Sequence, residues 1–146
     1  MRTTPTLRKN SVVVQYAVSR RGVPGAAALR AWARAAGSLP VTIRIVGASE
    51  GRRLNREYRK KNYATNVLSF DYGDMRGDIV LCHPVIAREA RAQGKSLRAH
   101  YAHLVVHGVL HLRGHAHDDK ASARHMEARE IRVLARFGFA DPYTLK

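Results

Sequence analysis

Three histidines near position 110 have the spacing of ligands for one metal ion. His107 and His111 are four residues apart, so on an α-helix they point about 40° apart from the same face. Gly114 then permits the chain to leave the helix through a left-handed conformation, and such a turn can bring His117 back toward the same ion. Three neutral imidazoles and one water form an open site of the catalytic type, so we expect one divalent ion, with zinc first.

The arrangement His107-x3-His111-x2-Gly114-x2-His117 has the ligand spacing of the metzincin proteases. In those proteases a glutamate directly follows the first histidine and serves as the general base. Gly108 occupies that place here, which argues against peptide hydrolysis by the metzincin route. A glycine also lets another backbone approach the helix, which is the structural interpretation of this position.

Other interpretations of the histidines remain open. Residues 104–112 are apolar almost all round, so their helix is predicted to be buried and a lone His107–His111 pair could be core histidines bound to carbonyls or carboxylates. His103 gives a competing triad with the same pair, but three successive helical turns spread it over about 12 Å, which is too far for one ion. We therefore favour His117 as the third ligand. The remaining histidines are expected behind the ligands or at the surface: His100, His103, His115 and His125.

The charge balance favours a polyanionic partner. The 146 residues hold 26 Lys and Arg against 11 Asp and Glu, a formal net charge of +15, and no acidic residue precedes Glu50. Such an excess favours nucleic acid, although a solvated basic surface is the alternative. A second basic cluster, interrupted only by Glu57, comprises Arg52, Arg53, Arg56, Arg59, Lys60 and Lys61.

The remaining composition predicts a soluble cytoplasmic protein of one domain, residues 1–146, with residues 1–10 as a flexible tail. The hydrophobic share of 45% is that of a globular protein. Cys82 is the single cysteine and stands in an apolar run, which favours a buried structural thiol in a reducing compartment. Neither a signal peptide nor an apolar stretch of membrane-spanning length is evident.

Periodicity and turn residues predict an α+β fold with a small sheet. Residues 41–46 alternate in polarity and predict a strand with one solvent-facing side, while Leu54 and Tyr58 lie on a possible core face of the following helix. The predicted strands are 11–18, 41–46, 66–70 and 77–82. The predicted helices are 26–36, 47–62, 84–94, 97–112 and 121–137.

Four segments resemble the YbeY family of bacterial rRNA-maturation factors. The most specific is HGVLHLRGHAH at 107–117, followed by LNREYRKKNYATNVLSF at 54–70. GDIVLC at 77–82 and MEAREIRVL at 126–134 are also similar to family stretches. The similarity covers about residues 41 to 135.

The resemblance implies that His107, His111 and His117 are the metal ligands and that Arg59 is the functionally important arginine. It implies a small mixed sheet of about four strands flanked by helices, with the metal site on a buried helix and the loop after it. It further implies a metal-dependent endoribonuclease that prefers single strands and acts in 16S rRNA 3′-end maturation and ribosome quality control, with rRNA and the small ribosomal subunit as partners. Three positions depart from the family pattern: Ala64 for Pro, His115 for Tyr and Ala116 for Asp.

The mechanism we expect is metal-assisted cleavage of an RNA phosphodiester. The ion would polarise a phosphoryl oxygen or lower the pKa of its bound water, and Arg59 would stabilise negative charge on the phosphate. Asp118 is a weak candidate for a general base, with a helix cap as the alternative role, and Asp118 or Asp119 could replace the Asp absent at Ala116. A non-catalytic, metal-stabilised ribosome- or RNA-binding factor and a metallohydrolase of another substrate are the alternatives.

Overall fold

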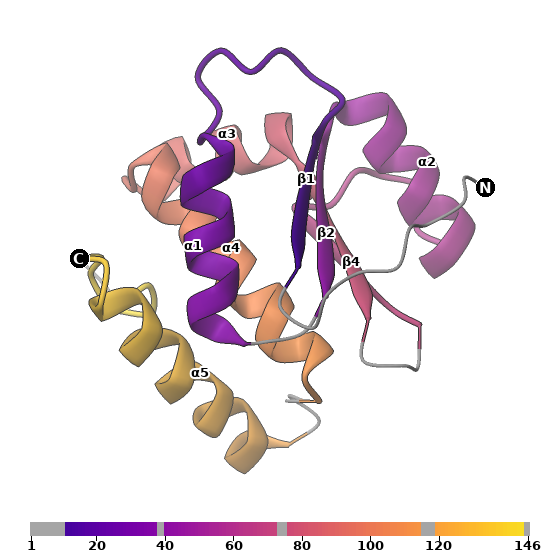
Figure 1. The fold of residues 1–146 in the computed structure, drawn as a ribbon. Coiled ribbons are helices and arrows are strands. Elements are labelled where there is room, and N and C mark those ends of the chain that lie inside the picture. The colour runs from indigo at the N-terminus through magenta and orange to yellow at the C-terminus, as the bar shows by residue number, and fades with distance from the viewer. Residues whose placement is uncertain (1–10, 38–39, 73–75, 115–118, 145–146) are drawn as a thin grey trace.

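The computed structural model describes residues 11–37, 40–72, 76–114 and 119–144, so the predicted tail 1–10 lies outside the described residues. Nine elements follow one another along these residues (Figure 1). The strands are β1 (Val12–Tyr16), β2 (Val41–Val46), β3 (Val67–Asp71) and β4 (Gly77–Cys82). The helices are α1 (Ala26–Ala36), α2 (Ala48–Arg59), α3 (His83–Ala92), α4 (Leu97–Leu112) and α5 (Lys120–Ala135).

The strands form one mixed sheet in the order β1-β2-β4-β3. β1, β2 and β4 are parallel, with Val41 opposite Gly77 at the start of the β2–β4 pair. β3 is antiparallel to β4 and places Val67 opposite Leu81. The predicted α+β class with a small mixed sheet is therefore confirmed, and β3 lies at one end of the sheet.

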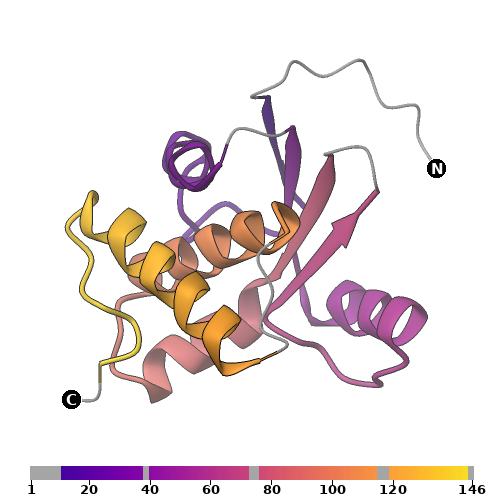
Figure 2. The same cartoon turned by 90° about the horizontal axis from the view of Figure 1, so that it is seen from below.

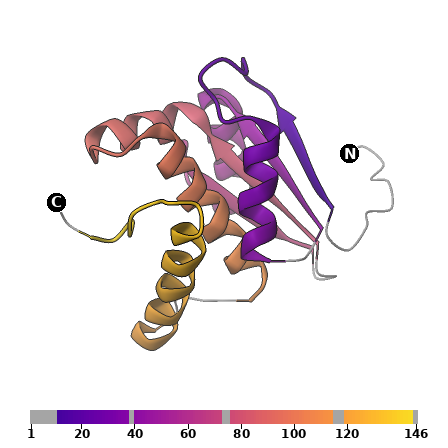
Figure 3. The ribbon, with the colours of Figure 1, turned by 60° about the vertical axis from the view of Figure 1, so that its left-hand side comes forward.

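Helices cover both faces of this sheet. In Figures 1 and 3, α1, α4 and α5 lie on one side of the strands and α2 lies on the other. The larger core joins Trp32 of α1 and Leu110 of α4 to the sheet residues Ile43 and Ile79. A smaller core lies under α2, where Leu54 packs against a buried set formed by Val46, Leu68, Val80, Cys82 and Val85.

Two expectations about exposure are wrong, and both concern α2. The polar face of β2 is mostly covered, since Thr42 is 8% exposed and Val46 fully buried, and only Arg44 reaches solvent, with 37% of its side chain exposed. The smaller core covers that face. At the edge of this core, the Arg44 guanidinium donates two hydrogen bonds to the Glu50 carboxylate, at 2.7 and 3.0 Å. Tyr58 is not a core residue either, because 63% of it is exposed. The prediction of a buried thiol at Cys82 is confirmed.

α4 is the central helix and packs against β4 at a glycine. Ser96 caps the helix by accepting a hydrogen bond from the Ala99 amide at 3.0 Å. A Cβ atom on Gly108 would lie 3.0 Å from Cδ1 of Ile79, so the close approach expected at this glycine is made by a side chain and not by a backbone. Gly114 follows the helix with a φ of +95°, which confirms the predicted left-handed turn.

α5 begins after Asp119, whose carboxylate accepts a hydrogen bond from the Ser122 amide at 2.8 Å. The cap of this helix is therefore Asp119 and not Asp118, which lies outside the described residues. Within the described part of the chain, each helix is too short or too polar to cross a membrane.

Candidate metal centre and adjoining groove

Two of the three predicted ligands lie side by side on α4. The rings of His107 and His111 stack with their centroids 6.4 Å apart and their planes 14° apart. The His107 side chain is 25% exposed and His111 is exposed, so both reach the surface of the helix. The third predicted ligand, His117, lies outside the described residues together with His115 and Ala116.

A buried carboxylate from α5 contacts His107 of this pair and also His103, the preceding histidine on α4. Glu130 is fully buried, and its Oε2 lies 2.9 Å from Nδ1 of His107. Its Oε1 lies 2.8 Å from Nε2 of His103 and accepts a hydrogen bond of 2.5 Å from the Tyr143 hydroxyl. An imidazole that donates from Nδ1 to a carboxylate can still bind an ion through Nε2, and the carboxylate then orients the ring and strengthens it as a ligand.

Glu130 is ionised in this environment. Burial alone would raise the pKa of its carboxyl group, but hydrogen bonds from His103, His107 and Tyr143 outweigh burial and lower the pKa to about 2. Burial and the contact with Glu130 raise the pKa of the Tyr143 hydroxyl, which therefore stays a neutral donor. The interface between α4 and α5 thus contains a fixed negative charge, which favours a nearby cation.

A second group of side chains could also hold an ion. His103, His107 and Glu130 each offer one ligand atom, and these three atoms lie within 4.8 Å of one another. The ring of His103 stands nearly perpendicular to that of His107, at 80° and 6.2 Å between centroids. Two candidate ligand sets therefore share His107, one with His111 and one with Glu130.

Sequence reasoning did not find Glu130 or Tyr143. A signal for Glu130 exists, because it follows the buried Met126 by four residues and precedes the buried Val133 and Leu134 by three and four. A carboxylate on the apolar face of a helix requires a buried partner. Tyr143 lies beyond α5, and nothing in the local pattern indicates its contact with Glu130.

A groove of about 680 Å³ adjoins the histidine pair. It is lined by Tyr58 and Arg59 of α2, by residues 67–72 and by His107 and His111. α2 and α4 lie on opposite faces of the sheet (Figure 2). Residues of both helices line the groove, which therefore extends along β3, the strand at the end of the sheet. Arg59, the exposed last residue of α2, thus shares one cavity with histidines that lie far from it in the sequence.

Two asparagines hold the connection from α2 to β3. The Asn55 side chain is fully buried and donates to the Tyr63 carbonyl at 2.7 Å. Asn66 accepts a hydrogen bond from the Val67 amide at 2.6 Å and donates to Glu89 of α3 at 3.0 Å. These contacts explain two of the three asparagines of the segment 54–70, since they determine where β3 starts and hence where the groove lies.

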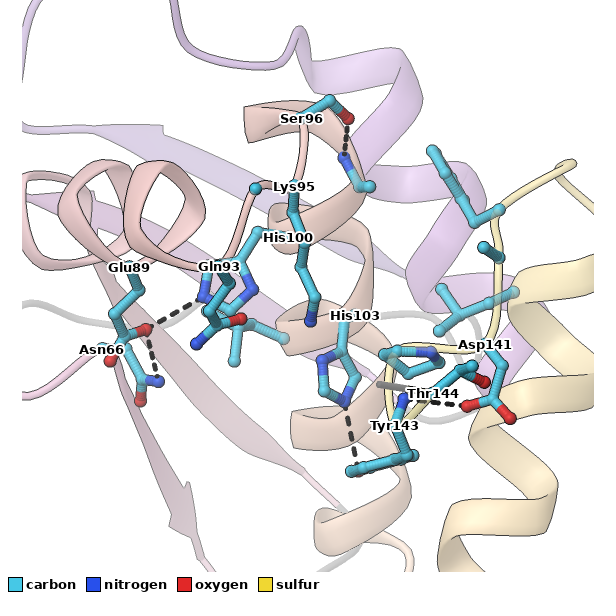
Figure 4. A pocket seen from close by; sticks show the side chains of 17 residues that line it. Asn66, Glu89, Gln93, Lys95, Ser96, His100, His103, Asp141, Tyr143 and Thr144 are labelled. Carbon is cyan, nitrogen blue, oxygen red and sulfur yellow. Dashed lines mark hydrogen bonds and ion pairs between the residues drawn. The ribbon is translucent and has the colours of Figure 1, made fainter. Parts of the chain in front are cut away.

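Four histidines of α4 form a row along the helix: His100, His103, His107 and His111. A second cavity, of about 760 Å³, lies at the N-terminal end of this histidine row (Figure 4). The same Glu89 carboxylate lines it and lies 2.9 Å from Nε2 of the buried His100. His103 and Tyr143 also line it, and both contact the buried Glu130, which in turn contacts His107 at the groove.

The fold and the site define a class: a small α+β protein with a candidate metal centre of histidine type on its buried central helix. A family model described as endoribonuclease YbeY matches residues 26–138. The chain belongs to this YbeY family, as its four similar segments predict.

Curated relatives extend over most of the chain. An endoribonuclease YbeY of Methylibium petroleiphilum is 58% identical over 117 residues, which cover 77% of this chain and 78% of the relative. That of Aromatoleum aromaticum is 52% identical over 141 residues, covering 91% and 92%. The solution structure of a Thermotoga maritima protein superimposes with a TM-score of 0.55 over 91% of this chain and 99% of that chain, at 19% identity, and supports the fold alone.

Proposed function

We propose that this protein is a metal-dependent endoribonuclease that prefers single-stranded RNA. The observation that carries the proposal is the groove along β3, in which a guanidinium and two adjacent imidazoles line one cavity. Membership of a family whose curated members are named endoribonucleases supports RNA as the substrate. The net charge of +15 favours the same class of partner.

The proposed ligands are His107, His111 and His117, with zinc as the first expectation for the metal. The donor chemistry fits, because neutral imidazoles suit zinc and Glu130 is placed to orient His107 from behind. When bound, the ion would supply Lewis-acid activation of water or of a phosphoryl oxygen. Three protein ligands leave a coordination position for water or substrate.

Arg59 is proposed to bind the scissile phosphate and to stabilise its negative charge, because a guanidinium matches two phosphate oxygens at once. The other basic residues of α2 and its C-cap are exposed on the same helix, and they would grip the RNA backbone without reading its sequence. They are Arg52, Arg53, Arg56 and Lys60, and the exposed Lys61 that follows the C-cap belongs to the same set.

The physiological role that we propose is 16S rRNA 3′-end maturation and ribosome quality control in the cytoplasm, with the small ribosomal subunit as partner. This role rests on the family resemblance of the segments 54–70 and 107–117, because the groove itself can accept any unpaired strand.

One experiment tests the catalytic proposal. Purified protein is incubated with a labelled single-stranded RNA, with and without a chelator, beside the variants Arg59→Glu and Arg136→Glu. Arg136 is exposed at the end of α5, outside the groove, so this control makes the same change of charge elsewhere. We expect loss of cleavage with the chelator and with Arg59→Glu, and retention with Arg136→Glu. RNA binding without cleavage by the metal-loaded protein would instead indicate a non-catalytic RNA-binding factor.

A second experiment separates the two ligand sets. Zinc content is measured for His111→Ala and His103→Ala after purification and dialysis. The proposed set predicts that His111→Ala loses the ion while His103→Ala retains it, with weaker affinity because the support of Glu130 is disturbed. The opposite result would place the ion among His103, His107 and Glu130.

A further inference from the structure

Two exposed tyrosines stand at the groove beside the histidine pair. Tyr58 is 63% exposed and Tyr72 is 50% exposed, and both line the same cavity as Arg59, His107 and His111. Exposed apolar surface that gathers at a groove is typical of a binding site, and aromatic side chains contribute a large contact area there.

Both rings are held in place by neighbours of the fold. The Tyr58 ring stands edge-on to Phe70 of β3, with centroids 5.1 Å apart and planes at 72°. The Tyr72 hydroxyl donates to the Asp78 carboxylate at 2.6 Å. Burial of the hydroxyl and this contact raise the pKa of Tyr72 to about 12, with a smaller contribution from Tyr58, so the Tyr72 phenol is neutral and lies close to Tyr58. The rings are thus ordered before any ligand arrives, which reduces the entropy lost on binding.

We propose that Tyr58 and Tyr72 are stacking platforms for two bases of the RNA strand and that they make the site select unpaired RNA. The inference rests on the proposed function, because it assigns the substrate contacts of the same groove. An aromatic face binds any base by stacking, whereas the bases of a duplex are already stacked on one another and are not available. Arg59 would then contact the phosphate between the bases, next to the histidines.

The competing explanation is packing alone, in which Tyr58 simply covers Phe70. The two explanations differ in which substitutions of Tyr58 should preserve RNA binding. Tyr58→Leu keeps an apolar side chain against Phe70 but has no aromatic face, whereas Tyr58→Phe keeps the face and loses only the hydroxyl. Tyr63 offers a matched control, since it is 56% exposed and lies on the α2–β3 connection but does not line the groove.

The test measures binding of a fluorescent single-stranded oligoribonucleotide and of an abasic strand of the same length. Tyr58→Leu and Tyr72→Leu are expected to weaken binding of the base-bearing strand by about 5- to 150-fold each. Binding of the abasic strand should change by less than about twofold, because stacking needs a base. Tyr58→Phe and Tyr63→Leu should bind both strands like the wild type. In cleavage assays the loss should appear mainly in KM, since the tyrosines bind the strand and do not act on the phosphate.

Several results would overturn the inference. One is equal loss for the base-bearing and abasic strands, and another is unchanged binding in both leucine variants. Equal affinity of the wild type for the two strands would also exclude stacking. A different result would refute the proposed enzyme but support the stacking platforms. In that case the protein would bind bases through Tyr58 and Tyr72 but would not cleave RNA.

Discussion

Replacing Gly108 by alanine tests why the central helix has no side chain at the position of the metzincin base. A Cβ atom at residue 108 would lie 3.0 Å from Cδ1 of Ile79 and 3.3 Å from its Cγ1 and Cγ2. Carbon atoms prefer about 3.5–4.0 Å, and Ile79 is fully buried in the larger core. The isoleucine therefore has to move or α4 has to shift away from β4.

The expected net effect is a loss of about 1 kcal/mol in the free energy of unfolding. Overpacking of a buried site costs about 1–3 kcal/mol, while alanine is better than glycine inside a helix by about 1 kcal/mol. For a urea dependence of about 2 kcal/mol/M, the unfolding midpoint of Gly108→Ala should fall by about 0.5 M.

A double-mutant cycle with Ile79→Val isolates the contact. Ile79→Val alone should cost about 0.5–1.5 kcal/mol, but it removes the methyl group nearest to the new Cβ. The double variant should therefore be more stable than the sum of the two single effects by at least about 0.5 kcal/mol. If Gly108→Ala stabilises the protein by about 1 kcal/mol, or if the two effects simply add, then helix propensity governs the position and the packing argument is wrong.

Three further predictions concern single side chains. The Arg44 hydrogen bond lowers the pKa of Glu50. The stabilisation by this pair is therefore present above the unfolded-state pKa of Glu50 and is lost as the pH falls through the folded-state pKa. In urea titrations, the stability difference between the wild type and Glu50→Gln should shrink from neutral pH to about pH 3, and a constant difference would contradict this. Burial raises the pKa of the Cys82 thiol, so an alkylating reagent should label it only as fast as the protein unfolds, and rapid labelling of folded protein would refute this. Glu130→Gln should weaken zinc affinity about 10- to 100-fold in competition with a chelator, because the support of His107 is lost; unchanged affinity would show that Glu130 does not act on the ion.

Much of the fold was predictable because its signals are local. The predicted ranges 26–36, 41–46, 77–82 and 97–112 coincide with α1, β2, β4 and α4. Runs of β-branched residues, helix formers and terminal glycines act within a few residues of the chain. The longer predictions, 11–18 and 47–62, exceed β1 and α2 by a few residues, as expected where helices and strands fray.

What local signals could not predict depends on contacts between distant segments. The alternation of 41–46 is real, but whether its polar face meets water depends on α2, which covers that face from outside the strand. Tyr58 has the spacing of a core residue, yet its helix ends at the groove and leaves the ring exposed. The contact of Tyr143 with Glu130 joins residues 13 apart through a turn of the chain, and no periodicity encodes it.

The histidine row on α4 supports His111 over His103 as a metal ligand through a gradient of burial. Side-chain exposure rises along the helix from 4% at His100 to 13% at His103 and 25% at His107, and His111 is exposed. The buried end is matched by carboxylates, Glu89 for His100 and Glu130 for His103 and His107. A buried imidazole needs such a partner to compensate for lost water, whereas an ion that activates water must contact solvent and substrate. We therefore propose that the row changes from structural support to metal binding at His107, which contacts the buried Glu130 carboxylate and also lines the groove.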